Sequence, residues 1–194
     1  MGNREALLDG AKRCLRERGF ARTTARDVAT AAGVSLAAIG YHFGSKEALL
    51  GQALIEASGE WVGELQRAVD SKGVTPGQGG ERFEAIWSGL LGRFAAERSL
   101  WAANFEISPY IEQMPELRRI FADAQQQARL GLVELFFGAD APGEPGAVDA
   151  LGSFLYALMT GVLAQWLVDP DRAPSARDLA SALQSTARTF HTGR

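Results

Sequence analysis

Side chains that could act in catalysis are few in this chain and far apart in sequence. The 194 residues include two histidines, His42 and His191, and one cysteine, Cys14, which lies in a helical stripe of apolar residues and so indicates packing. No serine lies in a nucleophile elbow, no histidine and acid spacing is typical of a metal site, and no glycine-rich phosphate loop follows a strand. The sequence therefore predicts no enzyme, no metal and no cofactor.

Residues suited to nucleic acid are instead concentrated between positions 23 and 50. Thr24 followed by Asp27 is the capping signal of a short helix. The turn Ala32-Gly33-Val34 ends that helix, because glycine adopts a positive φ at little cost. A second helix of under two turns is expected over 36–41. Two short helices joined by so tight a turn cross steeply, which is the helix-turn-helix arrangement.

The second short helix has outward side chains small enough for the major groove. A groove about 12 Å wide admits a helix whose outward residues are as small as Ala37, Ala38 and Gly40. Tyr41 and His42 carry tips suited to phosphate oxygens. Lysine in the first turn of the next helix opposes the helix dipole unless a phosphate lies there. The candidate DNA-binding residues are Thr24, Arg26, Ser35, Leu36, Ala37, Ala38, Tyr41, His42 and Lys46.

Residues 20–50 resemble the DNA-binding domain of the TetR family of bacterial transcriptional regulators. The matching features are Gly19, Thr23-Thr24, Val28-Ala29, Ala32-Gly33-Val34-Ser35, Tyr41-His42-Phe43 and Ser45-Lys46-Glu47-Ala48-Leu49. The resemblance implies a DNA-binding regulator with a downstream inducer-binding domain. One departure is Gly40, where the family most often has an aromatic residue, so Tyr41 is the nearest aromatic side chain for the usual phosphate contact.

Charge is distributed unevenly along the chain. Residues 1–50 contain 8 Lys and Arg against 5 Asp and Glu, a net charge of +3, whereas residues 51–194 contain 12 against 18, a net charge of −6. A positive surplus around the helix-turn-helix suits contact with a few phosphates, although a surplus this small could arise by chance. The composition is that of a soluble globular protein, and no basic-then-apolar leader opens the chain, so we expect a cytoplasmic protein.

The rest of the sequence predicts only helices. A first helix over 3–18, capped by Asn3, completes a three-helix DNA-binding domain over 1–50. A helix from Ser45 to about Val69 is shared with a larger helical ligand-binding and dimerisation domain over 51–194. Its glycines at 51, 59 and 63 allow either bending or close packing. Further helices are expected over 81–96, 100–112 broken or kinked at Pro109, 115–135, 148–168 and 175–190, and loops over 71–80, 138–146 and 169–174. The expected fold class is all-α.

The segment 148–168 is apolar nearly all round and must be covered on every side. Its length would suffice for a membrane span, but internal polar residues and an aspartate at each end argue against one. We expect one face on the chain's own core and one on a second copy, so that this helix and the last one form a four-helix dimer interface. Both helices could instead complete the core of a monomer. The candidate interface residues are Leu151, Phe154, Leu155, Leu158, Val162, Trp166, Leu179 and Leu183.

The middle helices carry more large aromatic residues than a small core requires. Most are expected in the core, but polar residues near them suit an apolar pocket for a small hydrophobic or aromatic effector. Glu106 would select a cationic or hydroxylated aromatic ligand, or else point to solvent. The candidate ligand-binding residues are Trp61, Trp87, Phe94, Trp101, Phe105, Glu106, Tyr110, Phe121, Gln125 and Arg129.

Together these features predict a ligand-responsive DNA-binding regulator. Two recognition helices related by a twofold axis would read a palindromic double-stranded DNA operator with half-sites roughly 34 Å apart. An effector would release the homodimer, which would therefore act as a repressor. The alternative is a ligand- or protein-binding helical regulator that no longer binds DNA, which Gly40 leaves open.

Overall fold

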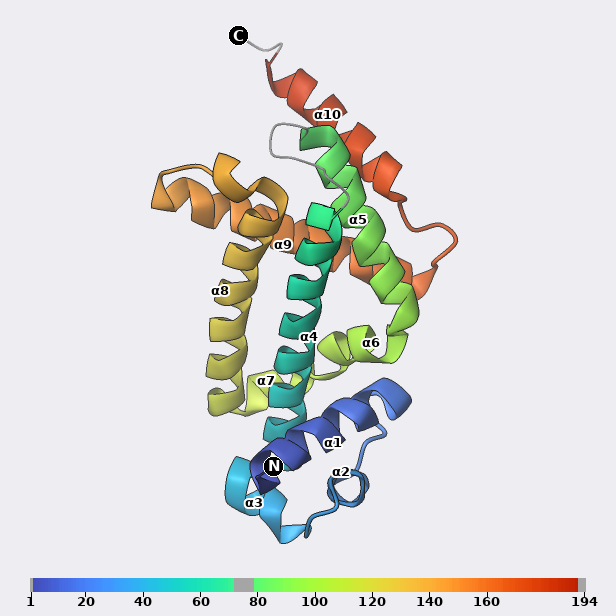
Figure 1. Cartoon of the computed structure of the whole chain (residues 1–194), viewed down its shortest axis with the longest axis vertical. Helices are drawn as coiled ribbons and strands as arrows, with labels where there is room; N and C mark the ends of the chain where they lie inside the picture. The colour runs from blue at the N-terminus through green and yellow to red at the C-terminus, as the bar shows by residue number, and fades with distance from the viewer. Residues whose placement is uncertain (1, 72–78, 192–194) are drawn as a thin grey trace. The chain divides into compact units, whose positions relative to one another are not determined.

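The computed structural model describes residues 2–71 and 79–191, in which all regular structure is helical (Figure 1). This confirms the predicted all-α fold class. The predicted loop over 71–80 falls largely outside the described residues. The elements are α1 (Asn3–Arg18), α2 (Ala25–Ala32), α3 (Ala37–Phe43), α4 (Lys46–Ser71), α5 (Gly79–Ala96), α6 (Arg98–Glu106), α7 (Ser108–Gln113), α8 (Pro115–Phe137), the 3₁₀ turn η1 (Gly138–Asp140), α9 (Pro145–Val168) and α10 (Ala176–His191).

Several helix boundaries differ by up to three residues from those predicted by the sequence; α9, for example, begins at Pro145 instead of residue 148. Asn3 is the first helical residue of α1 and not its cap; Gly2 precedes it, and the Gly2 N–H donates to the Glu5 carboxylate at 3.2 Å. The helix expected over 100–112 is broken, as one of the two alternatives at Pro109 predicted: it forms α6 and α7, separated at Ile107. Pro109 explains this break, because proline has no N–H to donate and its ring clashes with the carbonyl four residues earlier.

The helices form two compact units, each made of two stretches of the chain. Unit 1 comprises residues 1–61 and 97–127, and unit 2 comprises residues 62–96 and 128–194. Thus α6, α7 and the first half of α8 pack with the helix-turn-helix rather than with α9 and α10. Both α4 and α8 begin in unit 1 and continue into unit 2.

Unit 1 has a continuous apolar core that anchors the three N-terminal helices on α4, α6 and α8. Leu7, Phe20 and Leu50 are fully buried in it. The glycines of this unit differ in what surrounds them. A Cβ on Gly51 would lie 2.6 Å from Leu117 Cδ1, whereas one on Gly59 would meet nothing within 4 Å. Of the two roles left open for the α4 glycines, Gly51 therefore serves close packing.

Unit 2 is built on aromatic side chains and a close helix crossing. Phe83, Trp87 and Phe136 form a three-ring cluster with centroids 5.4 to 6.2 Å apart. A Cβ on Gly152 of α9 would lie 2.8 Å from the Arg129 carbonyl oxygen, so α9 and α8 cross in backbone contact there. Helix α10 packs along α5 (Figure 1).

Helix α9 is long and apolar enough, over Gly146–Val168, to cross a membrane by length and composition, with a mean hydropathy of 1.6. One such helix is weak evidence for a membrane span, because the core helix of a soluble protein has the same composition. Leu155, Val162 and Leu163 of α9 are indeed buried against the rest of unit 2. Of the apolar window in this span, 28% is buried inside the structure, and Phe154 and Val168 are exposed.

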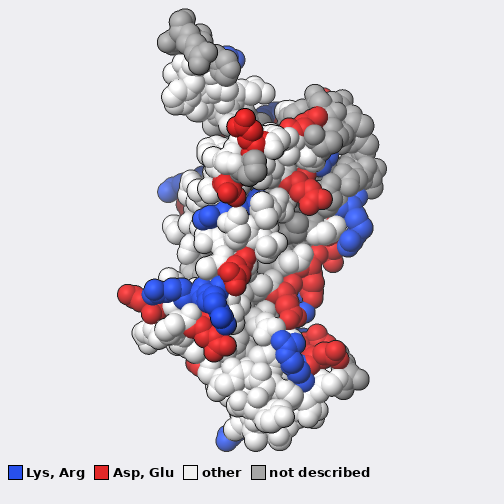
Figure 2. Space-filling model, turned by 90° about the vertical axis from the view of Figure 1, so that its left-hand side faces the viewer, with Lys and Arg blue, Asp and Glu red and all other residues white. Residues whose placement is uncertain are grey.

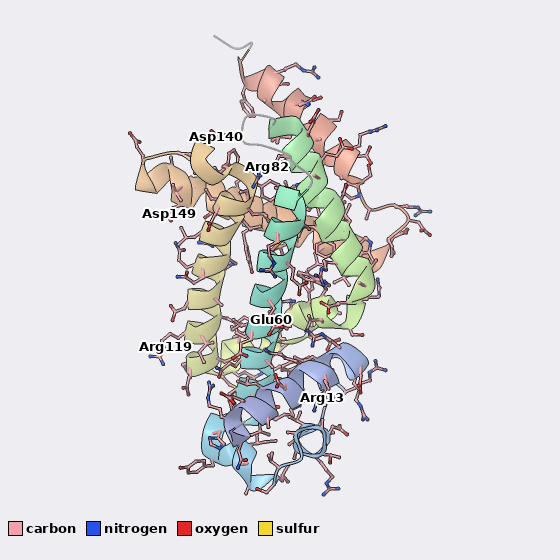
Figure 3. All side chains as sticks on the ribbon, viewed as in Figure 1. Arg13, Glu60, Arg82, Arg119, Asp140 and Asp149 are labelled. Carbon is pink, nitrogen blue, oxygen red and sulfur yellow. The ribbon has the colours of Figure 1, made fainter. Side chains whose placement is uncertain are left out.

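Arg82 is a buried arginine that holds the end of α8 in unit 2 (Figure 3). Its Nε and one terminal nitrogen donate to the Leu135 carbonyl oxygen at 3.1 and 2.9 Å. The last carbonyls of a helix have no partner within the helix, and the negative end of the dipole lies there. Arg82 on α5 therefore satisfies a carbonyl of α8 and joins the two helices.

We expect Arg82→Met to lower the free energy of unfolding by about 1–3 kcal/mol, because the Leu135 carbonyl loses its donors in a buried place. Urea unfolding followed by circular dichroism measures this. Arg177→Met is the matched control, since Arg177 is largely exposed and lies 4.0 Å from Glu84. Exposed pairs of this kind contribute about 0–1 kcal/mol. Equal losses in the two variants would contradict the role assigned to Arg82.

Candidate nucleic-acid interface

The first helix of the helix-turn-helix begins at a capping box, as the sequence predicted. The Asp27 N–H donates to Thr24 Oγ1 at 3.2 Å, and the Thr24 N–H and hydroxyl donate to Asp27 Oδ2 at 2.9 and 2.7 Å. Arg18 of α1 lies 3.1 Å from the other carboxylate oxygen. These hydrogen bonds from Thr24, and next the charge of Arg18, lower the pKa of Asp27. The carboxylate thus fixes the start of α2.

Because the pKa of Asp27 is lowered in the folded chain, its stabilising effect is present above the ordinary value of 3.8 and is lost as the pH falls through the folded pKa. We expect Asp27→Asn to be less stable than the parent protein at neutral pH, and the difference to shrink at about pH 3. Urea unfolding across this pH range measures it. Asp123→Asn, a change at an exposed aspartate of α8, is the control. A difference that stayed constant through the acid range would contradict this assignment.

The turn between α2 and α3 follows the predicted geometry. Gly33 has φ 67° and ψ 30°, in the left-handed region that glycine adopts readily. The N–H of Val34 donates to the Ala29 carbonyl at 3.1 Å, which closes the turn. Arg13 of α1 donates to the Ala31 carbonyl at the end of α2 (Figure 3). The turn is therefore held both by its own backbone and by α1.

Helix α3 is anchored by the buried Ile39 and by the half-buried Ala38 and Phe43, which pack against the same core. Ile39 is buried, whereas Leu36 is 51% and Tyr41 86% exposed. Ala37 and Gly40 are also exposed, and a Cβ on Gly40 would meet nothing within 4 Å. The chain carries no Asp, Glu, Lys or Arg from residue 28 to 45. On the face drawn in Figure 2, the part of unit 1 that carries α3 is accordingly mostly uncharged.

Aromatic side chains form a short row at the end of α3. The Tyr41 ring meets the edge of the His42 ring at 4.9 Å, and the His42 and Phe43 rings are 6.4 Å apart. The Arg4 guanidinium lies 5.3 Å from the Phe43 ring centroid. Arg4, in the first turn of α1, thus lies beside α3.

Lys46 is partly buried at the start of α4 and is bound to the chain before α2. Its Nζ donates to the Thr23 carbonyl at 3.1 Å, lies 3.4 Å from the Glu47 carboxylate and sits 5.7 Å from the Phe20 ring centroid. Ser45 caps α4, since its Oγ accepts the Ala48 N–H at 3.0 Å. Lys46 therefore also has a structural role that the sequence did not reveal.

The segment before α2 is held from the other side by α6 and α7. The Glu106 carboxylate accepts the Ala21 N–H at 2.8 Å. Tyr110 packs on Phe20, with ring centroids 5.2 Å apart. Glu106 was a candidate for ligand selection, but the structure brings its carboxylate to the backbone between α1 and α2.

A network of charged side chains joins α1 to α4 and α6 within unit 1. Lys12 is buried, and its Nζ lies 2.6 Å from a Glu60 oxygen and 3.1 Å from a Glu56 oxygen (Figure 3). Burial lowers the pKa of Lys12, but hydrogen bonds to both glutamates raise it, and the net result is a raised pKa. Arg16 Nε donates to Glu97 at 3.2 Å. The network holds α1 in place on α4 and α6, and α2 packs on α1.

The candidate ligand-binding residues are divided between the two units. Trp87 and Phe94 are buried in unit 2, where Phe94 packs on Trp166. Trp87 Nε1 and Arg129 Nε are buried and have no hydrogen-bond partner among the described residues. The side chain of Trp61 lies outside the described part. The remaining candidates belong to unit 1: Trp101, Phe105, Glu106, Tyr110, Phe121 and Gln125.

The candidate dimer residues differ in exposure within unit 2. Leu155, Val162 and Leu179 are buried by the chain itself, at 2 to 8% exposure. Phe154 and Leu183 are exposed, at 51% and 37%. The others, Leu151, Leu158 and Trp166, are half-buried.

Both the N-terminal segment with the helix-turn-helix and the C-terminal segment match known protein families. Residues 7–53 match the family model for bacterial regulatory proteins of the tetR family, and residues 78–188 match that of the tetracyclin repressor-like C-terminal domain. The transcriptional regulator TtgR of Pseudomonas putida is 30% identical over 173 residues, which cover 87% of this chain and 81% of TtgR. The transcriptional repressor AcnR of Corynebacterium efficiens is 29% identical over 126 residues, 64% of this chain and 59% of AcnR.

The fold also occurs in solved structures. The crystal structure of the multidrug binding protein EbrR complexed with imidazole superposes with a TM-score of 0.65 at 22% identity, covering 94% of this chain and 95% of EbrR. The relatives are transcriptional regulators and not enzymes. The capped helix-turn-helix and the match over both segments lead to one conclusion: the chain belongs to the TetR family of bacterial transcriptional regulators, which are ligand-responsive DNA-binding proteins.

Proposed function

We propose that this protein is a cytoplasmic repressor that binds a palindromic operator as a twofold dimer and is released by a small hydrophobic or aromatic molecule. The observation that carries the proposal is α3, which is anchored by Ile39 and exposes an uncharged surface ending in Tyr41. A surface of this kind fits the major groove, because a charged side chain there would lose its water and would need a base edge as its partner.

Residues on either side of α3 would hold the DNA backbone. Thr24 and Arg26 at the start of α2, Ser35, Tyr41 and His42 around α3, and Lys46 are the proposed contacts to phosphates and neighbouring base edges. Tyr41 is the proposed aromatic phosphate contact, because Gly40 has no side chain and Tyr41 is almost wholly exposed. Such contacts release counterions, so affinity would fall steeply with salt.

The proposed dimer interface lies on α9 and α10. Exposed apolar side chains on these helices, Phe154 and Leu183 among them, support it, since they remain uncovered by the chain itself. Leu155, Val162 and Leu179 would contribute indirectly, because they pack α9 and α10 against the rest of unit 2. A twofold axis here gives two α3 helices, and hence a palindrome with half-sites about one helical turn apart.

The proposed effector binds among the aromatic residues of the helices after α4. Relatives support this: TtgR and AcnR are transcriptional regulators, and EbrR is described as a multidrug binding protein. Trp87 and Arg129 each offer a buried N–H donor without a partner among the described residues. Buried donors are costly unless satisfied, so an effector that accepts a hydrogen bond would be favoured.

Effector binding would reach the DNA-binding helices through contacts within unit 1. Glu106 at the end of α6 holds the Ala21 N–H, and Arg16 of α1 holds Glu97 just before α6. A displacement of α6 would therefore shift the backbone around Ala21, which precedes α2. An effector has this effect only if it binds the released state better than the DNA-bound state.

A gel shift with DNA from upstream of the encoding gene, at low ionic strength, tests the proposal. We expect a dimer to bind a palindrome, and a small aromatic compound that binds the free protein in isothermal titration to weaken that binding. A strictly monomeric protein, or one that binds no fragment of its own genome, would contradict the proposal and favour a regulator that does not bind DNA. A bound compound that left operator affinity unchanged would contradict the repressor mechanism.

A further inference from the structure

The recognition helix lacks the side chains that usually distinguish one base pair from another. Bidentate contacts to guanine come from Arg or Lys, and those to adenine come from Asn or Gln. None of these four residue types occurs from residue 27 to 45. The polar groups present there on α3 are at its end, on Tyr41 and His42. Base recognition by α3 must therefore rest largely on another kind of contact.

Leu36, at the entry to α3, is an apolar side chain that the protein leaves uncovered. It is 51% exposed, although leucine is a residue that folding normally buries. The Ile39 N–H donates to the Leu36 carbonyl at 3.2 Å, so its backbone is fixed in the first turn. Ile39 faces the core three residues later, and Leu36 itself is turned to solvent on the surface that Ala37 and Gly40 share.

The only apolar group on the edge of a base pair in the major groove is the C5-methyl of thymine. An exposed leucine on a helix that enters this groove can lose water only against such a methyl. Cytosine at the same position has a hydrogen in place of this methyl, so leucine would bury less apolar surface there. Leu36 therefore distinguishes thymine from cytosine by the apolar contact that the methyl offers.

Resting on the proposed function, we propose that Leu36 determines operator specificity by contacting a thymine methyl group in each half-site. Ala37 beside it is too short to reach past the leucine, and Gly40 gives the groove edge room to approach the helix. Tyr41 and Lys46 set the register through phosphates, and Leu36 selects the base. Arg26 on α2 remains available for a guanine outside this position.

The test begins with the full-length protein and a randomised 40-base-pair duplex library, from which bound sequences are selected. The best duplex is then synthesised with thymine or with uracil, which lacks only the methyl, at the conserved positions of each half-site. Burying one methyl is worth about a fourfold change in affinity, and two half-sites give about fifteenfold. We expect uracil to weaken binding of the parent protein by this factor.

The Leu36→Ala variant completes a double-mutant cycle. It is expected to bind the thymine duplex about fifteenfold more weakly than the parent, and to lose less than about threefold further when uracil replaces thymine. Leu130→Ala, which truncates a 40% exposed leucine on α8, is the matched control and should respond to uracil as the parent does. Thermal unfolding of both variants monitors the fold. Any general effect of uracil on DNA stiffness is common to all three proteins and cancels in the cycle.

Two outcomes of the selection and the double-mutant cycle overturn the inference while leaving the proposed function intact. Selection of half-sites without a conserved thymine is one, and equal loss on uracil substitution for the parent and Leu36→Ala is the other. Failure to select any sequence would instead contradict the proposed function. An unchanged salt dependence in Leu36→Ala is also expected, because leucine neutralises no phosphate, and a shallower dependence would count against base readout.

Discussion

A Lys46→Gln variant is expected to bind operator DNA about a hundredfold more weakly than the parent protein at low salt, with a similar loss on unrelated sequences. Lys46 is 23% exposed at its side chain and stands at the first turn of α4, where the helix dipole favours an anion. A charge-assisted contact contributes roughly 1.5 kcal/mol, about tenfold per half-site, and a dimer has two.

The structure adds a second way in which Lys46 could act, since its Nζ also donates to the Thr23 carbonyl. Glutamine can keep this hydrogen bond but carries no charge, so the variant separates the two roles. If the charge meets phosphate, the slope of log affinity against log salt becomes shallower by about two for the dimer. Loss of positioning alone would lower affinity and leave the slope unchanged.

Fluorescence anisotropy with a labelled duplex, across a salt series, measures both quantities. Arg119→Gln removes the same charge from α8 and is the control (Figure 3). It should alter affinity several-fold at most, because Arg119 is not among the proposed DNA contacts and exposed charges are screened by salt. A loss confined to one operator sequence would contradict a phosphate contact for Lys46.

Replacing Gly10 with leucine is expected to cost about 3 kcal/mol of folding free energy and to abolish specific DNA binding. A Cβ at this position would lie 3.0 Å from the Ala32 backbone nitrogen and 3.1 Å from the Val28 carbonyl oxygen. Backbone atoms cannot rotate away as a side chain can. The larger residue must therefore separate α1 from α2 and shift α3 with it.

Gly59→Ala is the matched control for this change, because its Cβ would meet nothing within 4 Å in the middle of α4. Alanine is a better helix former than glycine, so this variant should be more stable than the parent by roughly 0.5–1 kcal/mol. Urea unfolding and operator binding measure both effects. A Gly10→Leu protein with parental stability and parental affinity would show that the α1–α2 contact is not as close as the structure has it.

Local signals explain why the helix-turn-helix could be predicted from the sequence. The Thr24–Asp27 box occurs as predicted, and Ser175 and Asp178, also three residues apart, form a similar box at the start of α10. Gly33 and Gly44 end α2 and α3 with φ 67° and 74°. Each signal needs only neighbouring backbone, so the sequence contains the whole interaction.

Contacts between distant segments could not be predicted in this way. Glu106 was a candidate for ligand selection, with a solvent-facing side chain as the alternative; its hydrogen bond from the Ala21 N–H, 85 residues earlier, was not predicted. Nothing in the sequence indicated that Arg82 would be buried and would donate to the Leu135 carbonyl. Nor did it indicate that α6 and α7 would pack with the N-terminal helices. The three glycines of α4 look alike in sequence, but only Gly51 is in tight contact with α8.

The amino-acid sequence by itself determined the class of the protein, the helix-turn-helix and the uncharged, small-sided character of its recognition helix, because capping, glycine turns and periodicity depend on residues within a few positions of one another. Tertiary structure alone decided which polar groups hold that motif and which apolar side chains of α9 and α10 stay exposed. Burial and long-range hydrogen bonds depend on the packing of segments far apart in the chain, and a one-dimensional pattern does not specify that packing.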